Sequence, residues 1–179
     1  MNQRKMPVYA SQWPYRGRIV SLRVDEIDSY RGDRRRTVEV VEHPGGVAIV
    51  AQPSPREIVL VRQYRHAVEA DLWEVPAGRI EPGEDEAETA RRELLEETGY
   101  RAERLEYLFS IDTTPGFCNE RIRLFAAHGL IAGAAEPEED EQFEIRTWPV
   151  EEAWRLVLAD ELRDAKTQIA LAWARARSA

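Results

Sequence analysis

The sequence predicts a mixed α/β fold, an α-β-α sandwich in which a mixed sheet lies between helices. Strand patterns fill most of the first half of the chain, one helical pattern interrupts them near the middle, and two helical patterns close the chain. This order of elements is typical of layered α/β domains. The chain has 179 residues, 43% of them apolar and 32% charged, which suits one ordinary globular domain.

The N-terminal region predicts an antiparallel hairpin or small sheet. Residues 17–27 alternate apolar and polar side chains, as a half-buried strand does. Residues 28–35 are rich in turn-forming residues, and residues 37–43 supply the returning strand. We therefore divide the chain into N-terminal strands at 1–43 and a main domain at 44–179.

The main domain predicts strands around one helix, followed by two closing helices. Residues 45–52 and 57–64 are almost continuously apolar, which is typical of central strands. Further strands are predicted at 72–78, 105–111, 121–129 and 142–150, and the closing helices at 150–159 and 163–177. The apolar residues of the closing helices that we expect to face the core are Trp154, Leu158, Ile169, Leu171 and Trp173.

The middle helix is defined by its ends and by a stripe of small residues. Gly83 precedes it, and Ala87, Ala90 and Leu94 are spaced to share one face. Gly99 follows the last turn, where a left-handed cap is expected. We therefore expect this face to pack on the sheet.

The other face of this helix is acidic. Glu93, Glu96 and Glu97 share it, although like charges at this spacing repel each other. A solvated surface is the ordinary explanation of such a run. Here a glycine-rich turn precedes the helix, Arg92 adjoins the carboxylates, and carboxylate oxygens are the hard ligands that Mg²⁺ and Mn²⁺ prefer. The pattern therefore favours a divalent-metal site.

Charge and cysteine content exclude several classes of protein. The formal net charge of −8 argues against a general nucleic-acid binder, which needs a basic surface. Cys118 is the single cysteine, so no disulfide forms within the chain, and we expect it to be a small buried residue in a reducing cytoplasm. The N-terminal residues lack the apolar run of a signal peptide or a membrane span.

Residues 78–100, GRIEPGEDEAETARRELLEETGY, resemble the Nudix box, G-x5-E-x7-R-E-U-x-E-E-x-G-U, where U is a bulky aliphatic residue. Tyr100 replaces the final aliphatic residue, which is a packing position. The matching residues are Gly78, Glu84, Arg92, Glu93, Leu94, Glu96, Glu97 and Gly99. The resemblance implies the Nudix fold and the hydrolysis of a nucleoside diphosphate linked to another group.

The resemblance also implies the metal chemistry. Glu93, Glu96 and Glu97 would ligate about two or three Mg²⁺ or Mn²⁺ ions, which bridge the phosphates and position the attacking water. Glu84 and Arg92 would support the ligands, and with Glu93 they would act in catalysis. The carbonyl oxygen of Ala77 is implied as a further ligand.

Segments outside the box resemble the ADP-ribose pyrophosphatase subfamily. They are V-V-E-H-P-G-G-V, V-R-Q-Y-R before L-W-E-V-P-A-G, and T-T-P-G-F-C-N-E-R, in which Thr114 replaces the more usual Ser before Pro115. The resemblance implies that Arg65 contacts the diphosphate. Glu120 would bind the terminal ribose or help to orient Arg65, and Phe117 would line the ribose pocket or simply pack.

The acidic loop at 136–141 would supply the general base and one more metal ligand. The resemblance assigns Glu139 as the base and Glu141 as the ligand, with Glu138 as an alternative base. No single residue is favoured as the shelf for the adenine. The candidate aromatic residues are Trp13, Tyr15, Tyr30 and Trp73.

The resemblance implies a homodimer formed through the N-terminal strands. It leaves the substrate open between ADP-ribose and another nucleoside diphosphate sugar, such as ADP-glucose, UDP-glucose or GDP-mannose. A non-catalytic domain that senses ADP-ribose is a second class, disfavoured by the intact box. RNA decapping is a third, disfavoured by the acidic net charge. No nucleic-acid or membrane partner is expected.

Overall fold

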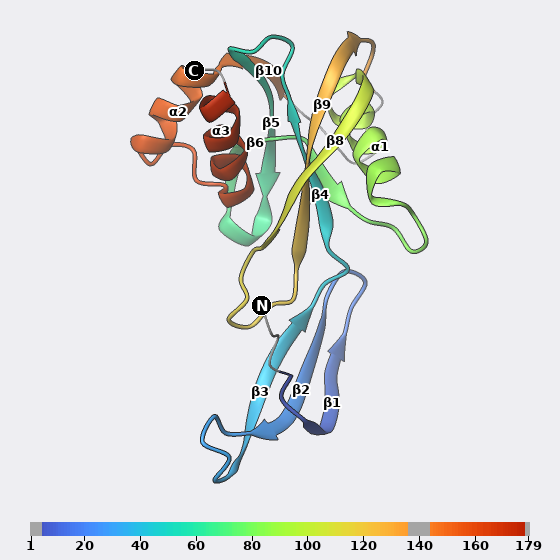
Figure 1. Cartoon of the computed structure of the whole chain (residues 1–179), viewed down its shortest axis with the longest axis vertical. Coiled ribbons are helices and arrows are strands. Elements are labelled where there is room, and N and C mark those ends of the chain that lie inside the picture. Colours follow the sequence, from blue (N-terminus) through green and yellow to red (C-terminus); the bar gives the residue numbers. More distant parts are fainter. Residues whose placement is uncertain (1–4, 136–143, 178–179) are drawn as a thin grey trace. The chain divides into compact units, whose positions relative to one another are not determined.

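The computed structural model describes residues 5–135 and 144–177 (Figure 1). Within them the chain forms two compact units. One contains the N-terminal strands as far as Gly45, together with the segment Asp112–Arg121, and the other contains Gly46–Ile111 and the residues from Ile122 onward.

The first unit is a three-stranded antiparallel sheet in the order β1-β2-β3. Its strands are β1 (Val8–Arg16), β2 (Ser21–Asp28) and β3 (Arg35–Glu42). The segment Asp112–Arg121 is bonded to β3, because the Val41 N–H donates to the Phe117 carbonyl oxygen at 2.7 Å. The predicted hairpin is confirmed as β2 and β3, whereas β1 is an additional strand.

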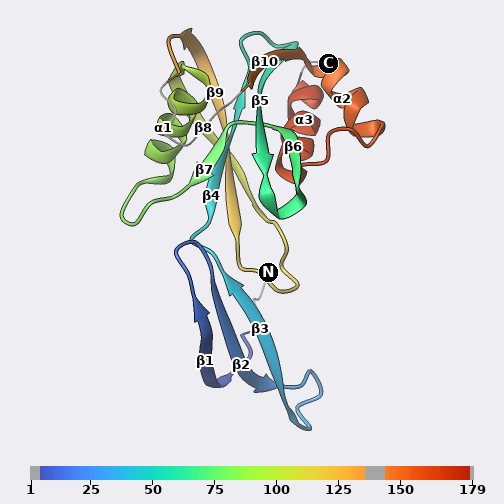
Figure 2. The same ribbon diagram turned by 180° about the vertical axis from the view of Figure 1, so that it is seen from behind.

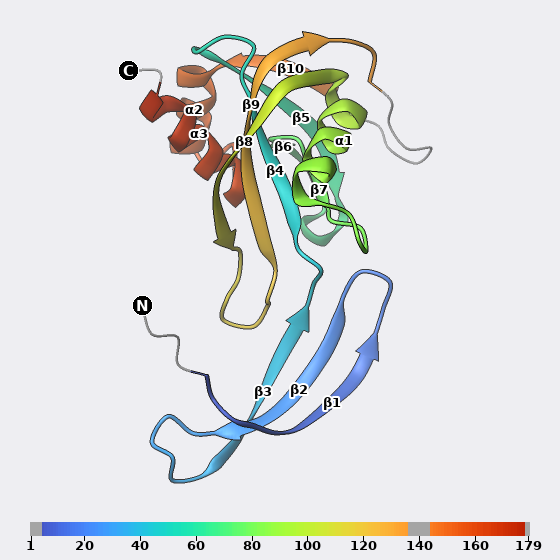
Figure 3. The ribbon, with the colours of Figure 1, turned by 45° about the vertical axis from the view of Figure 1, so that its right-hand side comes forward.

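The second unit contains two sheets. Strands β4 (Gly46–Ala51), β7 (Ala77–Arg79), β8 (Tyr100–Asp112) and β9 (Arg121–Ala132) form one, in the order β7-β4-β9-β8. Strands β5 (Glu57–Arg65), β6 (Ala70–Glu74) and β10 (Glu144–Pro149) form the other, in the order β10-β5-β6. Strand β4 runs parallel to β9 and antiparallel to β7, so the first of these sheets is mixed (Figure 3).

Helices cover both sides of these sheets, as the predicted sandwich requires (Figures 1 and 2). Helix α1 (Glu86–Thr98) lies on one side, and α2 (Val150–Leu158) and α3 (Ala165–Arg177) lie on the other. A short 3-10 helix, η1 (His66–Val68), links β5 to β6. No helix in the described residues has both the length and the apolar character that crossing a membrane needs.

Two apolar cores result, because successive side chains of a strand point to opposite faces. On β4, Val47 and Ile49 join the core under α1, while Ala48 and Val50 join the core under α2 and α3. Strands β5 and β9 divide their side chains in the same way. This double burial explains why the sequences of β4 and β5 are continuously apolar.

Besides the additional strand β1, the structure differs from the predicted elements at Pro76 and at Leu158. The strand predicted at 72–78 is divided into β6 and β7, and Pro76, which has no N–H to donate to a strand partner, lies in the gap. Leu158 was predicted to face the core, but it is 73% exposed. It shares the exposed face of α2 with Glu151 and Arg155, which the 3.6-residue helical period places in line with it.

Candidate active site

Helix α1 is fixed at both ends by capping groups. Asp85 is the N-cap, and its Oδ1 accepts a hydrogen bond from the Ala87 N–H at 2.9 Å. Gly99 ends the helix in the left-handed conformation with φ of 73°, and a Cβ there would lie 2.7 Å from two backbone atoms of the Gly133–Ala135 segment. Its N–H donates to the Leu95 carbonyl oxygen at 2.8 Å. The acidic face therefore lies on a rigid helix.

Arg92 holds three of the carboxylates that the sequence singles out. Its Nε donates to Glu84 Oε1 at 3.0 Å, and its Nη1 lies 2.8 Å from Glu93 Oε1 and 2.9 Å from Glu96 Oε2. Nη2 reaches Glu84 Oε2 at 3.1 Å. The hydrogen bond from Arg92 lowers the pKa of Glu84 to about 2. A single guanidinium thus offsets the repulsion along this face.

The Glu84–Arg92 pair predicts a specific acid response. Because the pKa of Glu84 is lowered from 4.5 to about 2 in the folded protein, the pair contributes stability above pH 4.5 and loses it as the pH falls toward 2. Glu84→Gln should remove this part of the acid dependence. Thermal midpoints measured between pH 6 and pH 2 should therefore fall less steeply for the variant. Parallel curves for the two proteins would contradict the prediction.

Two carboxylates of α1, Glu97 and Glu93, lie against consecutive residues of β7. Glu97 is 4% exposed, and its Oε2 accepts a hydrogen bond from the Ala77 N–H at 3.0 Å. The Glu93 carboxyl group packs against Gly78, where an added Cβ would lie 1.9 Å from Glu93 Cδ. Gly78 is therefore needed for this close approach. The packing of α1 on β7 thus places one carboxylate against Ala77 and the other against the neighbouring Gly78.

The chemistry of these groups fits a divalent metal. Glu93 and Glu97 of α1 offer hard carboxylate oxygens beside β7. The resemblance adds the carbonyl oxygen of Ala77 as an expected ligand. In the described residues, no three acidic, histidine or cysteine side chains form a ready metal cluster. Glu96 is turned to Arg92. Further ligands would come from water or from parts of the chain outside the described residues.

Gly78→Ala should test how closely Glu93 must approach the strand. The atoms nearest to the added methyl group belong to the end of the flexible Glu93 side chain, so we expect Glu93 to move while the fold is retained. Glu93 is predicted to act in catalysis, and a displacement of about 1 Å in such a group should lower turnover by up to about 10²-fold. We expect this loss of kcat with a nearly unchanged thermal midpoint. Gly78→Ala added to Glu93→Gln should have little further effect, and additive losses would contradict the displacement.

Arg65 is positioned by a residue that no sequence pattern singled out. Glu74, at the end of β6, accepts hydrogen bonds from Arg65 Nε at 2.7 Å and Nη2 at 2.8 Å. Glu74 is only 1% exposed. Hydrogen bonding to Glu74 raises the pKa of Arg65, and the negative charges of Glu97 and Asp164 act in the same direction. The sequence did contain one signal for Glu74, an isolated glutamate within an apolar strand. A buried carboxylate needs a partner of opposite charge or a hydrogen-bond donor.

The predicted ribose-binding residues lie in the first unit, in the segment Asp112–Arg121. The Thr114 carbonyl oxygen accepts hydrogen bonds from Phe117 N at 3.2 Å and Cys118 N at 2.9 Å, which closes a tight turn after Pro115. Phe117 is 57% exposed. Glu120 accepts a hydrogen bond from Thr113 Oγ1 at 2.8 Å. The ribose-binding roles of these residues stay predictions.

The aromatic candidates for the adenine shelf divide into two groups. Trp73 packs edge-on against Trp148 with ring centroids 5.5 Å apart, so it belongs to the apolar core. Trp13, Tyr15 and Tyr30 are exposed on the first unit. Trp13 donates its indole N–H to Glu42 Oε2 at 2.8 Å. The three candidates of the acidic loop, Glu138, Glu139 and Glu141, lie outside the described residues.

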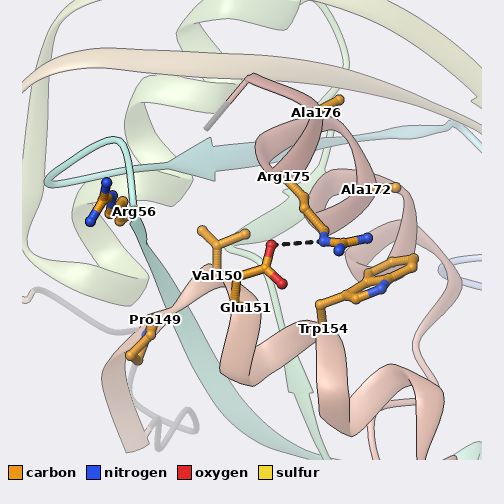
Figure 4. A pocket seen from close by; sticks show the side chains of 8 residues that line it. All are labelled: Arg56, Pro149, Val150, Glu151, Trp154, Ala172, Arg175 and Ala176. Carbon is orange, nitrogen blue, oxygen red and sulfur yellow. Dashed lines mark hydrogen bonds and ion pairs between the residues drawn. The ribbon is translucent and has the colours of Figure 1, made fainter. Parts of the chain in front are cut away.

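A separate pocket of about 540 Å³ lies between α2, α3 and the turn before β5 (Figure 4). Trp154 and Val150 line it, and Arg175 crosses it to pair with Glu151 at 2.7 Å. None of the predicted site residues lines this pocket. The candidate active site is therefore defined by α1 and β7 rather than by this hollow.

Comparison with known proteins identifies the family to which the chain belongs. The NUDIX domain matches residues 42–171, which include the acidic helix, both sheets of the second unit and Arg65. The chain belongs to the NUDIX family. A crystal structure of an ADP compounds hydrolase superposes with a TM-score of 0.82 at 24% identity, covering 98% of this chain and 95% of that one. This likeness confirms the predicted fold.

Two relatives are similar over most of their length. An ADP-ribose pyrophosphatase of Bacillus subtilis (strain 168) is 36% identical over 172 residues, which cover 95% of this chain and 92% of the relative. A methanol dehydrogenase activator of Bacillus methanolicus is 42% identical over 159 residues, which cover 88% of this chain and 85% of the relative. The predicted family resemblance is thereby confirmed.

Proposed function

We propose that the protein hydrolyses the pyrophosphate bond of ADP-ribose to AMP and ribose 5-phosphate in the presence of Mg²⁺. The observation that carries the proposal is the approach of two carboxylates, Glu93 and Glu97, to consecutive residues of β7 inside a NUDIX domain. Similarity to an ADP-ribose pyrophosphatase over 95% of the chain supports the choice of substrate. The subfamily segments around Arg65 and Pro115 support it as well.

Each residue has a task in this reaction. Glu93, Glu97 and the Ala77 carbonyl would hold a divalent metal, which would supply charge neutralisation for the phosphates and a lowered pKa for the attacking water. Arg92 keeps the carboxylates of α1 in place through the contacts described above. Arg65 binds the diphosphate with a permanently charged, planar group. Glu139 accepts the proton of the water, with Glu138 as the alternative, and Glu141 completes the ligands.

A substrate panel tests the proposal. The purified protein is assayed with Mg²⁺ against ADP-ribose, ADP-glucose, UDP-glucose, GDP-mannose, NADH, diadenosine polyphosphates and 8-oxo-dGTP, and kcat/KM is compared. We expect a clear preference for ADP-ribose. A flat profile, or a preference for another sugar nucleotide, would overturn the substrate while keeping the hydrolytic chemistry. Repeating the series with Mn²⁺, and fitting the metal dependence, tests the expected two or three ions.

The proposal includes a homodimer formed through residues 1–43, in a cytoplasmic protein. Four aromatic side chains of the first unit, Tyr9, Trp13, Tyr15 and Tyr30, are 40% to 72% exposed. Exposed apolar surface of this kind is typical of interaction sites. Light scattering should give twice the chain mass of 20.6 kDa. Monomeric protein at micromolar concentration would contradict the dimer.

Activation of an alcohol dehydrogenase is the second candidate function. It is favoured by the 42% identity to a methanol dehydrogenase activator. The test adds the protein and Mg²⁺ to a methanol dehydrogenase and follows the rate of methanol oxidation. An increased rate that is lost in Glu97→Gln would support this function. An unchanged rate would leave hydrolysis of free ADP-ribose as the activity.

A further inference from the structure

A buried cluster of charges joins the end of β6 to the start of α3. The carboxylate of Glu74 accepts hydrogen bonds from Arg65 and also from Lys166 Nζ. Lys166 donates a second bond, to Asp164 Oδ1 at 3.0 Å. The other oxygen of Asp164 accepts from the Thr167 N–H at 2.9 Å and from Thr167 Oγ1 at 2.6 Å, at the first turn of α3. The cluster contains two cations and two carboxylates, so its formal charges balance.

The side chains of this cluster differ in their exposure to solvent. The side chains of Glu74 and Lys166 are 2% and 11% exposed, whereas that of Arg65 is 40% exposed. Burial alone would raise the pKa of Glu74, but the hydrogen bonds from Arg65 and the charge of Lys166 outweigh it and lower the pKa. An ionised, enclosed carboxylate therefore holds one guanidinium that reaches solvent. Such a cluster contributes little net stability to the fold, because burying its charges has a large desolvation cost.

The same segment also connects the cluster to the candidate metal site. The Val75 N–H donates to Thr167 Oγ1 at 2.8 Å, and the Ala77 N–H donates to Glu97 Oε2 at 3.0 Å. The segment that begins with Glu74 is thus bonded to α3 at one end and to α1 at the other. The charge of Glu97 also acts on Arg65, which places the guanidinium within electrostatic range of this carboxylate.

We propose that Glu74 is a positioning residue for substrate binding, which holds the Arg65 guanidinium in one orientation while Lys166 fixes Glu74 from α3. Among the described residues, Glu74 engages Nε and Nη2 of Arg65, which leaves Nη1 available to bind a phosphate oxygen. Holding a side chain in its bound orientation reduces the entropy that binding costs. The inference rests on the proposed function, since it assigns the substrate diphosphate to Arg65.

The test is a double-mutant cycle of Glu74→Gln and Arg65→Met, with kcat and KM measured for ADP-ribose. Loss of a charge-assisted hydrogen bond should raise KM by about tenfold in Glu74→Gln, with kcat changed by less than about threefold. In the Arg65→Met background, Glu74→Gln should raise KM no further. Asp71→Asn is the matched control, because Asp71 pairs with Arg62 at 3.2 Å on the same two strands but is exposed. It should leave KM unchanged.

Other outcomes overturn the inference. An equal rise in KM with and without Arg65, or a fall in kcat at constant KM, would show that Glu74 acts by another route. If Glu74→Gln fails to fold, Lys166→Met takes its place in the cycle, with the same expected pattern. The dissociation constant of ADP, measured by calorimetry for the same variants, tests the role of Glu74 without requiring hydrolysis. It therefore separates this inference from the proposed function. If the wild-type protein does not hydrolyse ADP-ribose, the proposed function fails. The double-mutant cycle measured by ADP binding still decides the role of Glu74.

Discussion

Glu97→Gln is expected to lower the turnover of ADP-ribose by at least roughly 10²–10³, the loss that follows removal of one charge-stabilising group from a transition state. Glu97 is buried, and its carboxylate lies against Ala77, where the metal would bind. Glutamine still accepts the hydrogen bond from the Ala77 N–H but has lost the negative charge that attracts a divalent ion. The measurement is kcat with saturating ADP-ribose over a range of Mg²⁺ concentrations.

The control for this variant is Glu88→Gln on the same helix. Glu88 is exposed near the start of α1, and its backbone N–H rather than its side chain contacts the Asp85 cap. It should keep wild-type turnover. Both variants should retain the wild-type circular dichroism spectrum, because neither change alters the packing of α1. Retention of most activity in Glu97→Gln would remove Glu97 from the set of metal ligands.

Glu139→Gln is expected to reduce kcat by roughly 10²–10⁴ if Glu139 is the general base. Its amide cannot accept the proton of the attacking water, while the size of the side chain is kept. KM should change little, because substrate binding is assigned to other residues. The measurement is kcat as a function of pH. The loss of one carboxylate should abolish the acidic limb of the profile.

The neighbouring carboxylates separate the possible bases. Glu138→Gln and Glu141→Gln are assayed beside Glu139→Gln, with Glu144→Gln as a control from the start of β10, where Glu144 pairs with Arg62 at 3.3 Å. A Mg²⁺ dependence shifted to higher concentration in Glu141→Gln would identify a metal ligand rather than a base. An unchanged rate in Glu139→Gln would move the role of the base to Glu138 or Glu141, or leave activation of the water to the metal alone.

The main strands and helices were predictable because their patterns are local. The continuously apolar stretches became β4 and β5, and Gly99 ended α1 as expected. Strand β1 was not predicted, because every residue from Val8 to Arg16 is exposed and Pro14 interrupts its pattern. Leu158 was placed wrongly because its apolar character was followed, whereas the helical period puts it on the exposed face with Glu151 and Arg155.

The candidate site was predictable in part. The Nudix box identified the carboxylates of α1, because they lie in one short stretch. Glu74 and Lys166 are separated by 92 positions, and no spacing rule brings them together. Likewise, the contact between Gly78 and the Glu93 carboxyl group depends on how α1 packs on β7. Tertiary contacts of this kind follow from the fold and cannot be obtained from local patterns.

The pairing of Arg92 with three carboxylates has a consequence for the life of the protein in a cell. A helix with unopposed glutamates would depend on bound metal for its integrity, and metal depletion would then expose the chain to proteolysis. Here Arg92 belongs to the same helix, and its guanidinium reduces the repulsion among the three carboxylates without a bound metal. When magnesium becomes scarce, we expect activity to stop while the protein persists. Renewed supply of Mg²⁺ would then restore activity as soon as the ion binds, without synthesis of new protein.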